Sequence, residues 1–310
     1  MSQLSNSRRR ELDNPDVCAA LGIDTVELTT PIDVGTMASV VSSRHPFLEG
    51  PFPRAFAHRG WHLGELAGME SSLTAFRRAA AEGYRYLETD VRATRDGVVV
   101  VIHDATLDRT TDGCGEIEKL GWAAVKSARV AGREPICRLA DLLEELPGMR
   151  LNIDVKADSA VAPVLNLLHR TRGWDRVCLA SFSEARLQRL RTAAGPRLLT
   201  SLGTASAVAL RLRSMVLSRR GARKPATLPI RGRLAQLPVR MCGVQVVDRA
   251  LVRCAHRRGL EVHAWTVDRA ADMAALLDLG VDGLITDRPD VLRDVLRVRG
   301  VWPGAAAQAQ

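Results

Sequence analysis

The 310-residue sequence lacks any run of about eighteen consecutive apolar residues, and so it does not predict an integral membrane protein. Its six cysteines are far apart, at positions 18, 114, 137, 178, 242 and 254, and none forms a C-x-x-C pair. This spacing predicts neither a disulfide framework nor a zinc cluster, and it indicates a reduced, cytoplasmic compartment. The arginine run at 8–10 is followed by acidic and polar residues at 11–16 rather than by an apolar stretch, which disfavours an export signal.

Acidic residues are missing between Arg186 and Arg240, where thirteen basic residues stand. The rest of the chain carries 31 basic against 35 acidic residues, so this stretch accounts for the net charge of +9. Such asymmetry has two interpretations: peripheral contact with anionic phospholipid headgroups, or an arginine-rich exterior that only maintains solubility. The stretch has no interleaved aromatic residues, which disfavours nucleic-acid binding.

The pattern of polar and apolar residues divides the chain into three segments. Residues 1–50 show no sustained period and are expected to be a partly disordered extension, of which 1–36 are dispensable because Met37 makes a plausible start. Residues 51–298 are expected to form one domain, and 299–310 a C-terminal tail. Within the domain, 218–242 is rich in Arg, Gly and Pro and is predicted to be a basic surface loop.

Short apolar runs alternate with amphipathic stretches from Arg54 onward, which is typical of βα units around a parallel sheet. There are nine such runs: 55–57, 86–91, 98–102, 151–155, 177–181, 198–202, 244–247, 262–267 and 283–286. The run 98–102 follows 86–91 too closely for a parallel crossover, and Asp96-Gly97 suits a hairpin turn. Eight parallel strands remain, which predicts an α/β (β/α)₈ TIM barrel with a β-hairpin arm after the second strand. The helices expected between them are 72–81, 139–146, 159–170, 184–194, 206–217, 249–258 and 270–279.

Polar residues end several of these runs, where a (β/α)₈ enzyme carries its reactive groups. Glu88 and Asp90 lie two apart on one strand and so share a face, and Asp154 ends the neighbouring strand. Three converging carboxylates indicate a divalent cation, Mg²⁺ or Ca²⁺, because oxygen ligands suit these ions better than zinc. Salt bridges to barrel arginines are the alternative.

His58 ends the first strand and His103 ends the hairpin arm. Two histidines beside a carboxylate cluster predict an acid/base pair. Arg59 and Lys156 are placed to bind phosphate or to balance the carboxylates. Trp265 is a candidate apolar wall for the substrate, or else a core residue.

The ordered motifs resemble the glycerophosphodiester phosphodiesterase family from Ala55 to about Leu292. The resemblance rests on these segments: His58-Arg59-Gly60, Glu70, Glu88-x-Asp90, Asp96-Gly97 through His103-Asp104, Asp154-x-Lys156, Ser181-Phe182, 265–268 and 283–289. It implies a (β/α)₈ barrel, catalytic His58 and His103, a divalent cation on Glu88, Asp90 and Asp154, and substrate contacts from Arg59, Lys156, Trp265 and Glu70. It also implies a small-molecule glycerophosphodiester substrate, hydrolysed to glycerol 3-phosphate and an alcohol.

Two positions depart from the family pattern. Ser71 stands where the family usually has Asn, and serine is expected to serve as N-cap of the following helix. Asp154 stands where the family usually has Glu, and its shorter carboxylate must approach by about an ångström or bind through water. Two further hypotheses remain open: a lysophospholipid-directed phosphodiesterase at a membrane surface, and a catalytically weak ligand-binding barrel.

Overall fold

The computed structural model describes residues 45–217 and 229–302 of the chain. The predictions for 1–36, for the tail beyond 302, and for the part of the basic loop at 218–228 lie outside these residues. Among the described helices, none is long and apolar enough to cross a bilayer.

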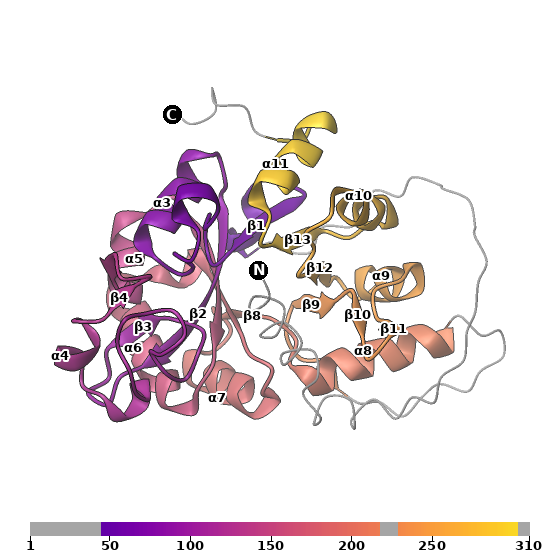
Figure 1. The fold of residues 1–310 in the computed structure, drawn as a ribbon. Coiled ribbons are helices and arrows are strands. Elements are labelled where there is room, and N and C mark those ends of the chain that lie inside the picture. Colours follow the sequence, from indigo (N-terminus) through magenta and orange to yellow (C-terminus); the bar gives the residue numbers. More distant parts are fainter. Residues whose placement is uncertain (1–44, 218–228, 303–310) are drawn as a thin grey trace.

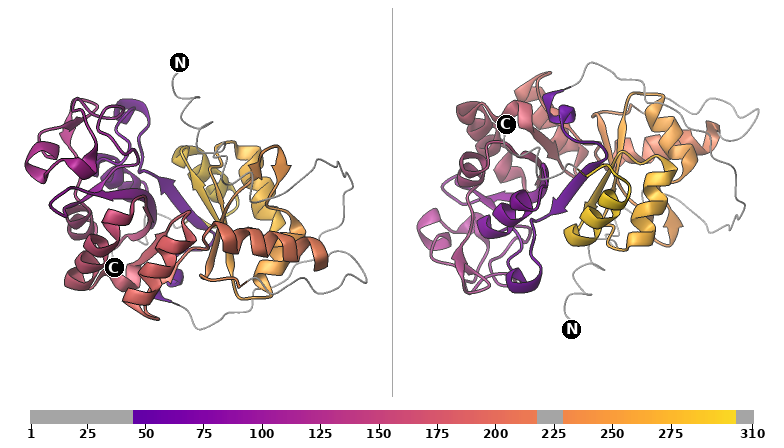
Figure 2. Two further views of the ribbon diagram at one scale, coloured as in Figure 1. Left: turned by 90° about the horizontal axis from the view of Figure 1, so that it is seen from below. Right: turned by 90° about the horizontal axis from the view of Figure 1, so that it is seen from above.

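Eight parallel strands form a nearly closed barrel, with helices on its outer side (Figures 1 and 2). The predicted TIM barrel is therefore confirmed. The order around the sheet is β8-β7-β6-β2-β1-β13-β12-β9, and a parallel bridge from Ser201 to Leu234 joins the two ends. The strands are β1 (Arg54–His58), β2 (Tyr86–Ala93), β6 (Arg150–Val155), β7 (Val177–Ala180), β8 (Leu199–Thr200), β9 (Leu234–Pro238), β12 (Glu261–Trp265) and β13 (Gly283–Thr286).

The predicted hairpin arm is also present. Strand β3 (Val99–Val101) pairs antiparallel with the end of β2, outside the order of the barrel. Gly97 takes a φ of 82° in the connecting turn, a conformation that glycine adopts without strain. Beyond the arm, the Ile102 amide donates to the Asp90 carbonyl at 3.0 Å, so the chain returns His103 to the level of Asp90 on β2.

The sixth barrel strand is not the predicted run at 244–247. That place belongs to β9, which pairs with β12 over its whole length. Val244 and Gln245 form β11, a short hairpin with β10 (Arg240–Met241). The predicted basic loop was therefore too long, because 234–238 lies in the barrel wall. The sequence of β9, Leu-Ala-Gln-Leu-Pro, conceals the strand because a polar residue stands at its centre.

The longer helices lie where the periodicity predicts them, apart from α11, which follows the last strand and was not predicted. They are α3 (Leu73–Ala81), α5 (Leu139–Glu145), α6 (Val161–Thr171), α7 (Glu184–Ala194), α8 (Thr204–Leu217), α9 (Arg249–His256), α10 (Ala270–Leu279) and α11 (Pro289–Val298). The expected cap of α3 is displaced by one residue: Ser72 accepts from the Ala75 amide at 3.1 Å, and Ser71 has a left-handed φ of 62°. Asparagine tolerates that conformation better than serine does, which agrees with the asparagine that the resemblance leads us to expect at position 71.

An excursion between β3 and α5 was not predicted. It contains η3 (Ile117–Lys119), α4 (Trp122–Val125), β4 (Arg129–Val130) and β5 (Glu134–Pro135). Its buried Leu107, Ile117 and Val125 form a second hydrophobic cluster with Val100 of the arm. This cluster anchors the arm that carries His103.

Residues just before β1 close the barrel at the N-terminal ends of its strands. The predicted extension reached residue 50, but 46–49 form η1 (Pro46–Glu49), and the fully buried Phe47 packs against Phe56 and Tyr86 inside the barrel. Arg54 donates to the Tyr86 hydroxyl at 3.0 Å and pairs with Glu261 at 2.8 Å. Among the described residues, these side chains fill the barrel at this end. The remaining short helices are η2 (Gly64–Leu66), η4 (Asp158–Ala160) and η5 (Gly173–Arg176).

Candidate active site

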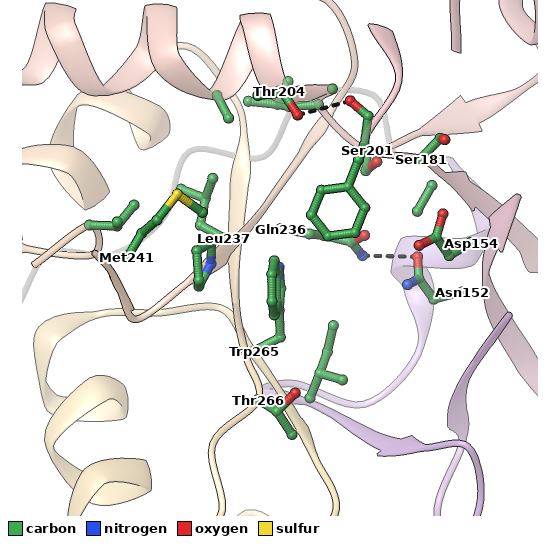
Figure 3. Close-up of a pocket in the computed structure, with 18 of the residues that line it drawn as sticks. Asn152, Asp154, Ser181, Ser201, Thr204, Gln236, Leu237, Met241, Trp265 and Thr266 are labelled. Carbon is green, nitrogen blue, oxygen red and sulfur yellow. Dashed lines mark hydrogen bonds between the residues drawn. The ribbon is translucent and has the colours of Figure 1, made fainter. Parts of the chain in front are cut away.

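A cavity of about 150 Å³ lies at the C-terminal ends of the barrel strands (Figure 3). Seven of the predicted site residues line it: His58, Arg59, Glu88, Asp90, Asp154, Lys156 and Trp265. Such convergence is expected where parallel strands end together around a barrel. His103 and Glu70 do not line the cavity, although both are connected to residues that do.

Strand register sets the carboxylate cluster. Asp90 lies directly across from Asp154 in the β2–β6 pair, and His58 lies across from Glu88 in the β1–β2 pair. Because side chains alternate along a strand, Glu88 and Asp90 both point inward. All three carboxylates are at least 90% buried, with relative exposures of 7%, 1% and 7% for Glu88, Asp90 and Asp154.

Two cations stand among these carboxylates. The Lys156 ammonium lies 2.9 Å from Asp90 Oδ1 and 2.8 Å from Asp154 Oδ2, and Arg59 Nε lies 3.0 Å from Asp90 Oδ2. Burial opposes ionisation of Asp90, but Lys156 and Arg59 outweigh it and hold its pKa well below the usual range. Burial instead dominates at Glu88 and raises its pKa to about 7. The cluster therefore holds an ionised Asp90 beside a Glu88 that titrates near neutral pH.

The carboxylates retain capacity for another ligand. Asp154 Oδ1 is buried without a hydrogen-bond partner. Glu88 Oε2 and Asp90 Oδ2 are also buried without a hydrogen bond, and each has an ion-pair contact, to His58 Nε2 at 3.5 Å and to Arg59 Nε at 3.0 Å. Unsatisfied buried carboxylate oxygens are costly, and a hard divalent cation satisfies them well. Across residues 45–217 and 229–302, no group of three His, Cys, Asp or Glu side chains already has the spacing of a metal site. The donor set thus fits Mg²⁺ or Ca²⁺, while the side chains as they stand are held by Lys156 and Arg59.

His58 contacts two carboxylates of the site through its two ring nitrogens. Its Nδ1 lies 2.5 Å from Asp287 Oδ1, and its Nε2 lies 3.5 Å from Glu88 Oε2. Burial disfavours the imidazolium, but Asp287 and Glu88 outweigh burial and raise the pKa of His58 to about 9. Asp287 is held in turn, because Asp268 accepts from its backbone amide at 2.9 Å. The imidazole is therefore oriented with Nε2 toward the carboxylates and carries a proton at neutral pH.

His103 belongs to a second chain of contacts. Its Nδ1 lies 2.6 Å from Asp104 Oδ1, and Arg109 donates to Asp104 at 2.6 Å. Arg109 and Arg59 both pair with Glu70, at 2.8 and 3.1 Å. Glu70 therefore contacts two arginines rather than the cavity, and it connects the loop after β1 to the residues beyond the hairpin arm.

The loop after β1 has the backbone needed to present these groups. Arg59 takes a left-handed φ of 56°, and its amide donates to the Glu88 carbonyl at 2.9 Å. Gly60 follows at a φ of 85°, and a Cβ there would lie 2.9 Å from the Ala75 carbonyl carbon. Left-handed backbone at a non-glycine residue is typical of functional sites, where surrounding contacts hold the strain.

Two residues of the site, Asp287 and His62, were not predicted from the sequence. Asp287 belongs to the closing motif and ends β13, so the rule that strand ends carry chemistry was sufficient to select it. His62 lies four residues after His58, and its Nε2 is 3.5 Å from Asp287 Oδ1. No spacing rule in the sequence connects His62 to residue 287.

Comparison with known proteins identifies the family of the chain. The sequence model of the glycerophosphoryl diester phosphodiesterase family matches residues 57–291. The chain belongs to this family. It is 45% identical over 253 residues to the probable glycerophosphodiester phosphodiesterase 2 of Mycobacterium tuberculosis, a match that covers 81% of this chain and 93% of that protein. The expected family and hydrolase class are thereby confirmed.

Solved structures share the fold of this phosphodiesterase family member. The crystal structure of a putative glycerophosphoryl diester phosphodiesterase from Silicibacter pomeroyi DSS-3 superposes with a TM-score of 0.66 at 25% identity, covering 84% of this chain and 98% of that one. An Oleispira antarctica phosphodiesterase, in complex with the product sn-glycerol-3-phosphate, superposes with a TM-score of 0.63 at 23% identity, covering 79% and 97%. At the lower identity the likeness establishes the barrel alone.

Proposed function

We propose that this phosphodiesterase hydrolyses glycerophosphodiesters to glycerol 3-phosphate and an alcohol. One observation carries the proposal: His58 and three buried carboxylates, each with an oxygen that accepts no hydrogen bond, line a single cavity that also contains Lys156 and Arg59. Carboxylates, two cations and a protonated histidine are the groups needed to bind a phosphodiester and release an alcohol from it.

A divalent cation, Mg²⁺ or Ca²⁺, would be held by Glu88, Asp90 and Asp154 and would supply Lewis-acid stabilisation of the phosphate oxygens. Lys156 and Arg59 add positive charge beside these carboxylates, and the guanidinium can bind two oxygens at once. Trp265 supplies an apolar wall of the same cavity. These residues position the phosphate before any proton moves.

The histidines have separate roles in this proposal. His58, with its pKa raised to about 9, donates a proton to the leaving alcohol oxygen. His103 takes the proton from the attacking oxygen, which belongs either to water or to the glycerol moiety itself. Asp287 and Asp104 orient the two imidazoles through their Nδ1 atoms.

Alanine at either histidine tests these roles. We expect His58→Ala and His103→Ala to lower kcat for glycerophosphocholine hydrolysis by about 10²- to 10⁴-fold. His169→Ala, which removes an exposed imidazole from α6, is the matched control and is expected to keep full activity. Undiminished turnover in His103→Ala would remove that residue from the mechanism.

Location and membrane contact are further proposals. The wide spacing of the cysteines favours the cytoplasm, whereas Cys242 is disulfide-bonded, which counts against a reducing compartment. The basic stretch 186–240 favours peripheral contact with anionic lipid. Several of its arginines are already paired, however: Arg186 and Arg189 with Asp158, Arg191 with Glu184, and Arg211 with Asp248. Liposome sedimentation at low and high salt tests the contact, and cell fractionation tests the location.

A further inference from the structure

Two amide side chains meet inside the barrel, deeper than the carboxylate pair of Asp90 and Asp154. Gln236 of β9 donates through Nε2 to Oδ1 of Asn152 on β6, at 2.9 Å (Figure 3). Strand β6 runs toward the open end of the barrel, so Asn152 lies two residues deeper than Asp154, roughly 7 Å along the strand. Both amides line the cavity and supply polar groups at its closed end.

His263, the neighbour of Gln236 on β12, determines which way the Gln236 amide faces. The His263 ring is fully buried, and its Nε2 lies 3.2 Å from Glu261 Oε2. An ionised carboxylate only accepts hydrogen bonds, so Nε2 carries the ring proton and Nδ1 is left as an acceptor. This Nδ1 lies 3.5 Å from Gln236 Nε2. The Gln236 nitrogen therefore faces both Asn152 and His263, and Gln236 Oε1 is turned away from them.

One donor and one acceptor of this amide pair remain available in the cavity. Asn152 uses its oxygen for Gln236, which leaves the Asn152 Nδ2 group, and Gln236 uses its nitrogen, which leaves Oε1. Neither atom bonds to another of the described residues, and both are open to the cavity. A hydroxyl group matches the pair, because it accepts from an N–H and donates to a carbonyl oxygen. A carboxylate or an ammonium group would satisfy only one of the two amides.

We propose that Asn152 and Gln236 bind the primary hydroxyl of the glycerol moiety, the hydroxyl that is furthest from phosphorus. The inference rests on the proposed function, which places the phosphate beside Lys156 and Arg59. The spacing of roughly 7 Å between Asn152 and Asp154 is close to the extended length from phosphorus to that hydroxyl.

In this arrangement the glycerol moiety lies at the closed end of the cavity, and the alcohol, which varies among glycerophosphodiesters, lies toward the open end. Asn152 and Gln236 are specificity residues, since they contact no reacting atom. A diester without the primary hydroxyl would leave both amides unpaired, which is the condition under which a hydrogen-bonding site discriminates strongly.

Two diesters test the proposal with the whole protein and with Mg²⁺ or Ca²⁺ present. Glycerophosphocholine is compared with 2-hydroxypropyl phosphocholine of the same configuration, which lacks only the primary hydroxyl. The secondary hydroxyl is present in both, so the same attacking group is available whether it is water or the substrate's own oxygen. We expect kcat/KM of the wild type to be about tenfold or more higher for glycerophosphocholine.

Variants of the amide pair locate the discrimination. The double variant Asn152→Leu/Gln236→Met keeps similar side-chain volumes and removes both amides together, so neither is left without its partner. We expect its ratio of kcat/KM for the two diesters to fall close to one, through a lower value for glycerophosphocholine. Gln188→Met, at an exposed glutamine of α7, is the matched control and should keep the wild-type ratio. A wild-type ratio in the folded double variant would overturn the inference.

Product binding supplies a measurement on the wild type that does not depend on the folding of a variant. In calorimetric titration, sn-glycerol 3-phosphate is expected to bind about fivefold or more tightly than 2-hydroxypropyl phosphate of the same configuration. Equal kcat/KM for the two diesters, or equal affinity for the two phosphates, would overturn the hydroxyl inference and leave the proposed function intact. Absence of hydrolysis for both diesters would overturn the proposed function and the inference with it.

Discussion

Asp287 fixes both the orientation and the charge of His58. The aspartate lies 2.5 Å from His58 Nδ1 and raises the pKa of that imidazole together with Glu88. Because the folded-state pKa of about 9 exceeds the ordinary 6.5, the pair stabilises the protein fully below pH 6.5, and this contribution is lost as the pH rises through 9. His58 is therefore cationic over the whole neutral range.

Asp287→Asn tests this coupling. We expect NMR titration of the metal-free variant to show a His58 pKa below the wild-type value of about 9, and kcat to fall by about tenfold or more because orientation and proton donation both suffer. Asp278→Asn, at an aspartate paired with Arg299 on the surface, is the control for loss of a carboxylate. An unchanged His58 pKa in Asp287→Asn would refute the coupling.

The length of the Asp154 side chain determines how closely this proposed ligand can approach the metal ion. Its carboxylate is one methylene shorter than the glutamate usual in the family, and Oδ1 is buried without a hydrogen-bond partner. We expect Asp154→Glu to tighten Mg²⁺ binding in calorimetric titration and Asp154→Ala to weaken it by about tenfold or more. Equal affinity in all three proteins would exclude residue 154 from the metal site.

Single residues of the site were predictable where strand alternation decides their direction. Glu88 and Asp90 had to share a face, and Asp154 had to end the adjoining strand. The Asp287–His58 pair was not predictable in the same way, since it joins residues 229 positions apart. The predicted N-cap of α3 was Ser71, but the N-cap is Ser72. The sequence preference for an N-cap fits either of the two adjacent serines, and only the backbone geometry assigns the role to Ser72.

The loop after β1 is the element on which the site depends most. Gly60→Ala would place a Cβ 2.9 Å from the Ala75 backbone at a φ that alanine rarely adopts. We expect the unfolding free energy to fall by about 2 kcal/mol or more, and activity to fall because Arg59 and His58 shift. Gly148→Ala is the control, since nothing lies within 4 Å of its added Cβ. Equal stability of the two variants, measured by urea unfolding, would contradict the strained-loop account.

The floor of the barrel carries a buried ion pair that responds to acid. Burial disfavours ionised Glu261, but His263 and Arg54 outweigh it and lower its pKa to about 2. Because the folded pKa lies below the ordinary 4.5, the carboxylate stabilises the protein above about pH 4.5, and this contribution is lost as the pH falls toward 2.

Glu261→Gln should therefore destabilise the protein at pH 7 by on the order of 3 kcal/mol. The difference from wild type should shrink between pH 5 and pH 3. Glu116→Gln, which removes only a surface pair with Lys119, is expected to change the unfolding free energy by less than about 1 kcal/mol. A Glu261→Gln deficit that is the same at pH 7 and pH 3 would contradict the pKa assignment.

Elements were predictable where apolar runs were continuous. Strand β9 was not, because Gln236 interrupts it and Pro238 ends it. Gln236 is satisfied by Asn152 across the barrel, at 2.9 Å (Figure 3). That partner is supplied by the tertiary fold, so periodicity alone assigned the strand to the more apolar run at 244–247.

In the whole molecule, the residues of the candidate active site and the buried residues of the barrel floor lie at opposite ends of the barrel. The inward face of β1 carries Arg54 in the floor, Phe56 in the middle and His58 at the open end, because alternate residues share a face. The number of barrel strands and the positions of seven of the eight could be inferred from the sequence, while β9 and the excursion after β3 could not; the short elements of the excursion leave no period.

Metal-dependent hydrolysis of a glycerophosphodiester at this open end is tested most directly by the release of glycerol 3-phosphate from glycerophosphodiesters by the whole protein with Mg²⁺, with Ca²⁺ and with a chelator. We expect release with at least one of the two ions, and loss of that activity on chelation that is reversed by adding the ion back. Release that is unaffected by chelation, or no release with either ion, would contradict it.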